Sequence, residues 1–454
     1  MHSTPRSWKS IAAPLVPLGL VLSAVCAWAD ETAGTASVAV TAASASAAPS
    51  VSIINSGDTA WVLVSAALVM LMTPGLGLFY GGMVRRKNVL STIMQSFFLV
   101  ALIGVQWVLY GYSLSFSPGN DFLGSFHWAF LNNLGATNPL APTIPHQAFM
   151  IYQAMFAIIT PALISGAFAE RIRFKGYVIF MLAWATLVYN PVCHWVWGGG
   201  FFTKMGALDF AGGTVVHMTA GYSALVLALF LGKRKGYGIE NMVPHNMTMV
   251  LIGASLLWFG WFGFNAGSAL GANALAASAF VATNTAAAMA TLSWALIEYL
   301  HRGKASALGA ASGAVAGLVA ITPAAGFVDL SGALWIGLLV SPICYFFVVV
   351  IKQKFGYDDS LDAFGVHGVG GTFGALATGL WANPAVNTAK GLFYGNPGQF
   401  VIQLKTVIAT MAYSAVVTLV LAFLVEKLVG LRAKDREEEI GLDLSQHGEA
   451  GYTI

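Results

Sequence analysis

Long apolar segments, separated by short polar stretches, fill most of this 454-residue chain. From Asp58 onward, each apolar segment is close to the roughly 20 residues that an α-helix needs to cross a lipid bilayer. The pattern therefore predicts an all-α polytopic membrane protein with about eleven transmembrane helices. These helices are expected near residues 60–82, 90–112, 147–169, 177–198, 211–231, 247–270, 275–298, 307–323, 331–350, 365–382 and 400–428.

Basic residues follow alternate apolar segments, and this alternation sets the expected orientation. Positive charge close to the ends of transmembrane helices favours the cytoplasmic side of the membrane. The odd-numbered segments are therefore expected to end in the cytoplasm, with the mature N-terminus in the periplasm and the C-terminus in the cytoplasm. The clusters lie after the first, third, fifth, seventh and ninth segments: Arg85–Lys87, Arg171–Lys175, Lys233–Lys235, His301–Lys304 and Lys352–Lys354.

The first 29 residues have the pattern of a secretory signal peptide. Two basic residues precede an apolar run, and Ala27-Trp28-Ala29 provides the small-x-small cleavage pattern. A first transmembrane helix is the alternative, but the run is short and contains two prolines. Residues 30–57 are rich in alanine, serine and threonine, which predicts a low-complexity periplasmic lead. The transmembrane domain is then expected at residues 58–429, followed by a polar cytoplasmic tail at residues 430–454.

An internal repeat is visible in two aspartate–histidine pairs. Asp209 precedes His217 by eight residues, and Asp359 precedes His367 by the same interval. The first pair opens the fifth segment and the second pair opens the tenth, so each half contains five helices. Because five is odd, the two halves must have opposite orientations in the membrane. The sequence therefore predicts two inverted five-helix repeats and a final helix, an arrangement that transporters use to build a site at the bilayer midplane.

Composition narrows the possible functions. Hydrophobic residues make up 57% of the chain and charged residues only 9%, well below the roughly 25% charged residues of soluble domains. A net charge of +3 is too small to indicate a nucleic-acid partner. The cysteines Cys26, Cys193 and Cys344 form neither a disulfide pattern nor a metal-binding spacing. We therefore expect lipid as the main solvent and no metal or other cofactor.

His217 and His367 lie deep inside apolar segments, whereas the other histidines lie near segment ends, in loops or in the termini. An ionisable group at such depth is costly and indicates a function. A packing histidine bonded to a backbone carbonyl is the alternative, but matched positions in an inverted repeat favour a functional pair. Facing imidazoles could share one ring proton. Asp209 and Asp359 are expected mainly to cap their helices, and Asp209 also to stabilise an arriving cation from the outer side.

Aromatic residues gather toward the expected outer face. Tyr152 and Phe156 are four residues apart, so their rings share one face of a helix. Trp197 ends the fourth segment, and Phe264 and Ser268 lie on the sixth. Interfacial aromatics usually form a membrane belt, but a desolvated ring face also attracts a small cation. These residues are therefore compatible with either a belt or a cation site.

Several longer motifs resemble the ammonium transporter family, which includes the Amt and Mep proteins and, more distantly, the Rhesus proteins. The motifs are Phe79–Gly82, Gly198–Gly200, Ala207–His217, Gly260–Ser268 and Phe364–Gly368. The resemblance extends from about residue 58 to the C-terminus. It implies a homotrimer of eleven-helix protomers in the cell inner membrane, each protomer with its own pore for ammonium or methylammonium.

The resemblance also implies roles for individual residues. It implies an outer recruitment site with Tyr152 over its entrance, at a position where the family commonly has phenylalanine. It further implies a phenylalanine gate and a pair of pore histidines. The residues are Trp197, Ser268 and Phe156 for the recruitment site, Phe156 and Phe264 for the gate, and His217 and His367 for the pore.

The polar tail contains two further motifs, Gly441–Asp443 and Ser445–Glu449. Both resemble the family's ordered C-terminal region, which packs on the cytoplasmic face and helps a PII-type signalling protein to close the pore. A loose, solvated tail is the alternative.

Ammonium and potassium are similar in size and charge, but only ammonium can lose a proton. A narrow apolar pore disfavours the charged form of the solute, so passage as neutral ammonia would exclude potassium. The histidines could also relay the proton.

An ammonium sensor, an intramembrane metalloenzyme and a Rhesus-like gas channel are the alternative functions. A sensor would usually carry a fused signalling domain, and a metalloenzyme needs a third ligand. Trp197 and Ser268 favour the cation-recruiting branch, and no enzymatic activity is expected.

Overall fold

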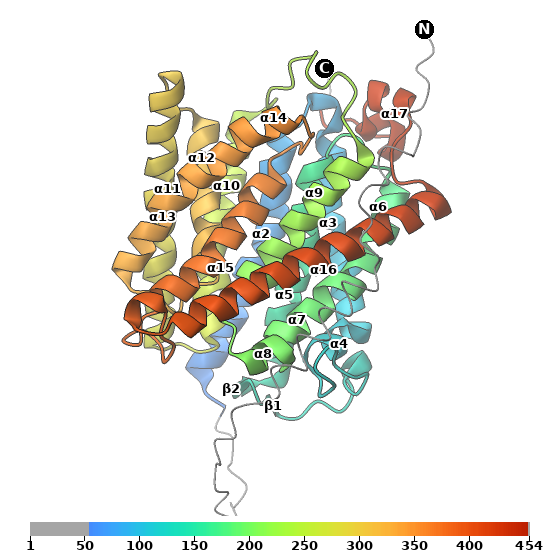
Figure 1. Ribbon diagram of the computed structural model, residues 1–454. Helices are drawn as coiled ribbons and strands as arrows, with labels where there is room; N and C mark the ends of the chain where they lie inside the picture. Colours follow the sequence, from blue (N-terminus) through green and yellow to red (C-terminus); the bar gives the residue numbers. More distant parts are fainter. Residues whose placement is uncertain (1–53, 453–454) are drawn as a thin grey trace, which may run out of the picture. The chain divides into compact units, whose positions relative to one another are not determined.

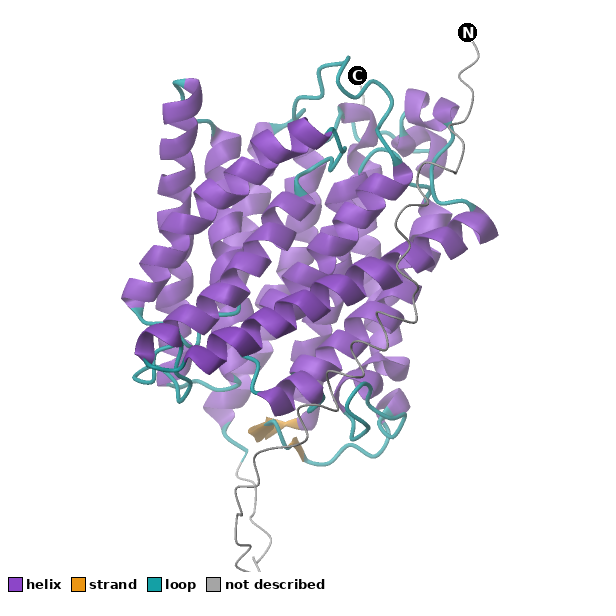
Figure 2. Ribbon diagram, in the orientation of Figure 1, coloured by secondary structure: helices purple, strands orange, loops and turns teal. Residues whose placement is uncertain are grey.

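The computed structural model describes residues 54–452, so the expected signal peptide and most of the expected low-complexity lead lie outside the described residues. Figure 1 shows long helices running through one bundle, with strands β1 and β2 at one end and α17 at the opposite end. Figure 2 shows that helices dominate the described chain. The α-helices are α2 (Ser56–Met83), α3 (Val89–Gln106), α4 (Tyr112–Phe116), α5 (His146–Phe168), α6 (Phe174–Trp184), α7 (Asn190–Val196), α8 (Phe201–Met205), α9 (Thr219–Leu231), α10 (Met247–Trp261), α11 (Ala274–Arg302), α12 (Ala307–Ile321), α13 (Leu330–Tyr345), α14 (Lys352–Phe355), α15 (Val369–Trp381), α16 (Pro397–Val429) and α17 (Asp435–Ile440).

Short segments of other kinds interrupt or join these helices. The strands β1 (Thr137–Asn138) and β2 (Ala141–Pro145) form an antiparallel pair. The π-helical segments are η3 (Trp107–Gly111), η5 (Ala185–Tyr189), η6 (Gly213–Met218), η7 (Phe262–Ala266), η9 (Phe346–Ile351), η10 (Phe364–Gly368) and η12 (Asp443–His447). The 3-10 segments are η2 (Arg86–Asn88), η4 (Ala129–Leu131), η8 (Gly267–Ala269) and η11 (Leu392–Tyr394). His217 lies in η6 and His367 lies in η10. Both histidines therefore lie in π-helical turns, which often occur at functional sites.

In the described part of the chain, nine helical runs are long and apolar enough to cross a membrane. Two further expected spans are present as the shorter apolar helix α12 and as the continuous run of η10 and α15. Each predicted span therefore corresponds to a helix whose ends lie within several residues of the predicted ones. The prediction of an all-helical polytopic membrane protein is confirmed.

The two halves of the bundle meet at a close backbone crossing beside the histidines. His217 lies just before α9 and His367 just before α15; α9 packs against η10, and α15 packs against η6. A Cβ on Gly221 would lie 2.0 Å from the backbone nitrogen of Gly368, and a Cβ on Gly371 would lie 2.9 Å from the Cβ of His217. Gly221 and Gly371 each follow their histidine by four residues. This reciprocal contact agrees with the predicted inverted repeat.

Buried charges join four loops at the end of the bundle that carries α17. Arg85 and Arg234 both pair with Glu170, at N···O distances of 2.8 and 3.5 Å, and Arg234 also pairs with Asp358 at 2.9 Å. Arg171 lies 3.8 Å from the Asp358 carboxylate. Burial alone would raise the pKa of Asp358, but the hydrogen bond from Arg234 and the charge of Arg171 hold that pKa below its ordinary value. The ion pairs thus hold the loops of both halves together at this end.

The C-terminal tail packs against the same end of the bundle. The Asp443 carboxylate accepts hydrogen bonds from the backbone N–H groups of Leu90 and Ser91 at 3.0 and 2.7 Å, so it caps the N-terminal end of α3. Leu442 donates its backbone N–H to the Asn88 side chain at 2.8 Å. For the described residues, the alternative of a loose, solvated tail is therefore wrong.

Candidate functional site

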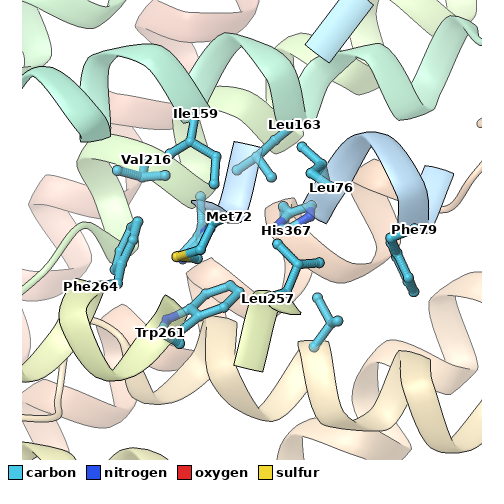
Figure 3. A pocket seen from close by; sticks show the side chains of 12 residues that line it. Met72, Leu76, Phe79, Ile159, Leu163, Val216, Leu257, Trp261, Phe264 and His367 are labelled. Carbon is cyan, nitrogen blue, oxygen red and sulfur yellow. The ribbon is translucent and has the colours of Figure 1, made fainter. Parts of the chain in front are cut away.

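The two histidines line an enclosed pocket beside the crossing of the two halves, which we call the histidine pocket. Figure 3 shows this pocket with His367 and most of the other lining residues labelled. His217 and His367 are 1% and 4% exposed, and their ring centroids are 5.4 Å apart with 19° between the ring planes. The other walls are formed by Met72, Leu76, Phe79, Ile159, Leu163, Val216, Leu257, Trp261, Phe264 and Val315. In this apolar lining, the imidazoles are the groups best suited to bond a small polar solute.

Aromatic neighbours orient the His217 ring. The ring is nearly parallel to those of Trp261 and Phe264, with centroids 5.4 and 6.0 Å away and interplanar angles of 24° and 20°. Neither nitrogen of His217 nor Nδ1 of His367 has a hydrogen-bond partner among the protein atoms. The hydrogen bond that two facing imidazoles could share is therefore absent, and the rings of His217 and His367 lie nearly parallel instead. These nitrogens are left available to a solute in the pocket.

Asp209 organises the start of η6, the segment that carries the first histidine. Its carboxylate accepts hydrogen bonds from the backbone N–H groups of Gly212, Gly213, Thr214 and Val215 at 2.6–3.1 Å, and from the Thr214 hydroxyl. Burial raises the pKa of Asp209 above its ordinary value, although these bonds oppose the rise. The expected helix cap is thus confirmed.

Asp359 is the counterpart of this cap in the second half. Its carboxylate accepts hydrogen bonds from the backbone N–H groups of Ala363 and Phe364 at 3.1 and 2.8 Å, at the start of η10. Burial and the nearby charge of Asp362 raise the pKa of Asp359 to about 6. A carboxylate therefore fixes the start of each histidine-bearing segment.

A second, more open pocket contains two of the aromatic residues expected at the outer face, and we call it the outer pocket. Phe156, Trp197 and Ser268 all line it. The ring of Phe156 is 5.8 Å from that of Trp197 at 85°, and 4.4 Å from that of Phe264 at 45°. Because Phe264 also lines the histidine pocket, the rings of Phe156 and Phe264 lie between the two pockets.

Tyr152 lies behind the outer pocket and is not part of its lining. Its side chain is fully buried, and its ring packs edge-on against that of Phe156 at 5.0 Å. Its hydroxyl lies 2.9 Å from the carbonyl oxygens of Gly263 and Phe264 and 3.1 Å from the hydroxyl of Ser268. The structure therefore places Tyr152 as a support of the pocket wall, whereas the resemblance implied a ring over the entrance.

Sequence reasoning missed several residues that line the pockets. Phe149, Gln153 and Phe210 line the outer pocket, and Met72 lines the histidine pocket. Gln153 offered a usable signal, because an amide inside an apolar segment is costly and often functional. Phe149 and Met72 offered none, since apolar residues on such helices look alike whether they face lipid, protein or a pore.

The described residues show no arrangement suited to metal chemistry. Across residues 54–452, no group of three or more histidine, cysteine, aspartate and glutamate side chains could hold a metal ion. A bundle of helices long and apolar enough to cross a membrane, with two pockets separated by a pair of phenylalanine rings, is an arrangement suited to the transport of small solutes.

The chain belongs to the ammonium transporter family, because the model of the Ammonium Transporter Family matches residues 60–452. It is 51% identical over 399 residues to the ammonium transporter of Bacillus subtilis (strain 168), which covers 87% of this chain and 98% of that protein. The crystal structure of Candida albicans Mep2 matches with a TM-score of 0.81 and 37% identity, over 88% of this chain and 91% of that one. The structure of a Sensor Amt Protein matches with a TM-score of 0.80 and 28% identity, over 86% and 98% of the two chains.

Proposed function

We propose that the protein recruits ammonium in the outer pocket and passes neutral ammonia through the histidine pocket, while the proton lost from ammonium returns to the outer solution or is carried separately by the histidines. Family membership supports ammonium transport, and the order of the two pockets supports the sequence of steps. The phenylalanine rings between the pockets would have to rotate for the solute to pass.

The outer pocket has the chemistry that a small cation requires. The rings of Trp197 and Phe156 offer faces that attract a cation. The Ser268 hydroxyl offers an oxygen that can accept a hydrogen bond from ammonium. These groups support roles for Trp197, Phe156 and Ser268 in recruitment, with Asp209 close by at the pocket wall.

The single observation that carries the proposed mechanism is the pair of imidazoles with unpartnered nitrogens in an otherwise apolar pocket. An apolar pocket disfavours a charged solute, whereas ammonia can bond to ring nitrogens as either donor or acceptor. Potassium has no proton to lose, so it would have to enter this pocket as a bare cation. Selectivity for ammonium over potassium would therefore depend on the ability of ammonium to lose a proton, and not on a difference in ion size.

We further propose a cytoplasmic membrane location, with residues 1–29 removed, the N-terminus in the periplasm and the C-terminus in the cytoplasm. The basic clusters after alternate spans support this orientation. Exposed apolar side chains on the spans, such as Phe97 and Leu292, suit contact with lipid and with neighbouring protomers of a homotrimer. The packed tail supports a surface that a PII-type signalling protein could recognise on the cytoplasmic side.

Purified protein in proteoliposomes tests the proposal. We expect saturable uptake of ammonium and methylammonium, with no comparable flux of potassium or sodium. Sustained potassium flux equal to ammonium flux would contradict the deprotonation step. Uptake that follows the ammonia concentration without saturating in ammonium would instead identify a Rhesus-like gas channel.

A further inference from the structure

The hydroxyl of Tyr152 is the polar group of α5 that reaches across to η7, the π-helical segment that carries Phe264. A π-helical turn is wider than an α-helical one, and each carbonyl oxygen has two lone pairs. The carbonyls of Gly263 and Phe264 can therefore accept a bond from a neighbouring helix in addition to bonds within their own segment. The Tyr152 hydroxyl lies 2.9 Å from both oxygens, but it has a single proton, which it can instead donate to the Ser268 oxygen 3.1 Å away.

The same hydroxyl also contacts Ser268, the polar hydroxyl of the outer pocket. Ser268 donates its proton to the carbonyl oxygen of Phe264 at 2.8 Å, and the oxygens of Ser268 and Tyr152 are 3.1 Å apart. With its only proton used on this carbonyl, Ser268 can offer the pocket only lone pairs. An acceptor is what ammonium needs, because ammonium has four N–H donors and no lone pair.

The backbone next to Ser268 leaves space for this contact. A Cβ on Gly267 would lie 2.7 Å from the Tyr152 hydroxyl and 2.6 Å from the Ser65 Cβ. Such distances are too short for an ordinary side chain, so any larger residue at position 267 would displace the hydroxyl or the segment. Glycine at this position is therefore part of the same arrangement.

We propose that Tyr152 is a positioning residue for Ser268: its hydroxyl holds Ser268 as a hydrogen-bond acceptor and thereby sets the affinity of the outer pocket for ammonium. Without the tyrosine hydroxyl, only the bond to the Phe264 carbonyl holds the Ser268 side chain, so Ser268 rotates more readily and can turn its proton toward the pocket, where the proton opposes a cation. This inference rests on the proposed recruitment of ammonium in the outer pocket.

Tyr152→Phe tests the inference, because it removes the hydroxyl and keeps the ring that packs against Phe156. We expect the half-saturation concentration for ammonium to rise roughly three- to tenfold, with the maximal rate largely unchanged. Tyr177→Phe is the matched control, since Tyr177 is also fully buried and donates to a helix carbonyl, that of Gln95, away from both pockets. A merely structural role would lower the thermal stability of both variants and leave the half-saturation concentration of both unchanged.

A double variant shows whether Tyr152 acts through Ser268. The half-saturation concentration of Tyr152→Phe combined with Ser268→Ala should equal that of Ser268→Ala alone. Gly267→Ala, which keeps the tyrosine but displaces its hydroxyl, should also raise the half-saturation concentration. If Ser268→Ala weakens capture but Tyr152→Phe does not, or if the two effects add fully, the inference is wrong and the recruitment site stands. If Ser268→Ala has no effect, both fail.

Discussion

The indole N–H of Trp197 donates a hydrogen bond to the backbone carbonyl of Asp209 at 2.8 Å. This bond joins a ring of the outer pocket to the residue whose carboxylate caps η6, the segment that carries His217. Asp209 therefore holds both the Trp197 ring, which we propose recruits ammonium, and the start of the histidine-bearing segment. Substitution of Trp197 or Asp209 should therefore change the geometry of both the outer pocket and the histidine pocket.

Trp197→Leu should weaken the capture of ammonium more than it lowers the maximal rate, because the ring faces the outer pocket. A cation–ring contact is worth roughly 0.5–2 kcal/mol, so the half-saturation concentration should rise roughly two- to thirtyfold. Concentration-dependent methylammonium uptake measures the change. Trp335→Leu is a suitable control, since Trp335 is 50% exposed on α13. Equal effects of the two variants would show that Trp197 belongs to a membrane belt.

His217→Ala and His367→Ala should each assemble in the membrane, yet lose transport or begin to leak potassium. Since the imidazoles do not bond to each other, the stability cost comes from lost packing, roughly 2–5 kcal/mol, rather than from a broken hydrogen bond. Uptake of ammonium and of potassium in proteoliposomes measures the result, with the exposed loop variant His127→Ala as the control. A variant without both histidines that moved ammonium normally and still refused potassium would show that the pair only fills space.

Gly221→Ala should destabilise the protein strongly, because its Cβ would lie 2.0 Å from the Gly368 backbone nitrogen. Overpacking of this kind costs roughly 1–3 kcal/mol or more. Gly104→Ala on α3 is the matched control: its Cβ would meet only Ile158, at 3.8 Å, and alanine favours a helix by roughly 1 kcal/mol. Thermal unfolding in detergent should separate the two variants. A Gly221→Ala protein as stable as the wild type would mean that the halves can move apart at this point.

Asp443→Ala should release the C-terminal tail while leaving the bundle folded. The substitution removes the acceptor for the N–H groups of Leu90 and Ser91, and loss of a helix cap costs roughly 0.5–2 kcal/mol. Limited proteolysis should then cleave the tail faster.

A truncation after Leu431 should likewise leave a folded protein but abolish inhibition by a PII-type partner. Full inhibition of the truncated protein would show that the tail plays no part in regulation.

Much of the fold could be predicted because lipid imposes simple rules on length and charge. Apolar segments of the required length gave the helices, and the spacing of Asp209 and His217 against Asp359 and His367 gave the inverted repeat. The relation between the imidazoles could not be predicted, because it depends on the rings of Trp261 and Phe264 packed beside His217.

The position of Tyr152 shows a second limit of sequence reasoning. Its spacing from Phe156 correctly predicted a shared helix face and a ring contact. The direction of the hydroxyl depends on the widened backbone of η7, and a π-helical insertion has no clear signature in hydrophobic periodicity. The outer lining residue Phe149 was missed for a related reason, since periodicity does not distinguish a lipid-facing from a pore-facing ring.

The glycine crossing beside the histidines restricts how a solute can pass. Backbones of the two halves touch at Gly221 and Gly368 without side chains between them, and buried ion pairs such as Arg234–Asp358 join loops of both halves at one end. Transporters that alternate their access rock one repeat against the other around the site, and such rocking would have to break these contacts. We therefore propose that the solute passes by small rotations of rings such as those of Phe156 and Phe264, while the backbone of the two halves stays in place.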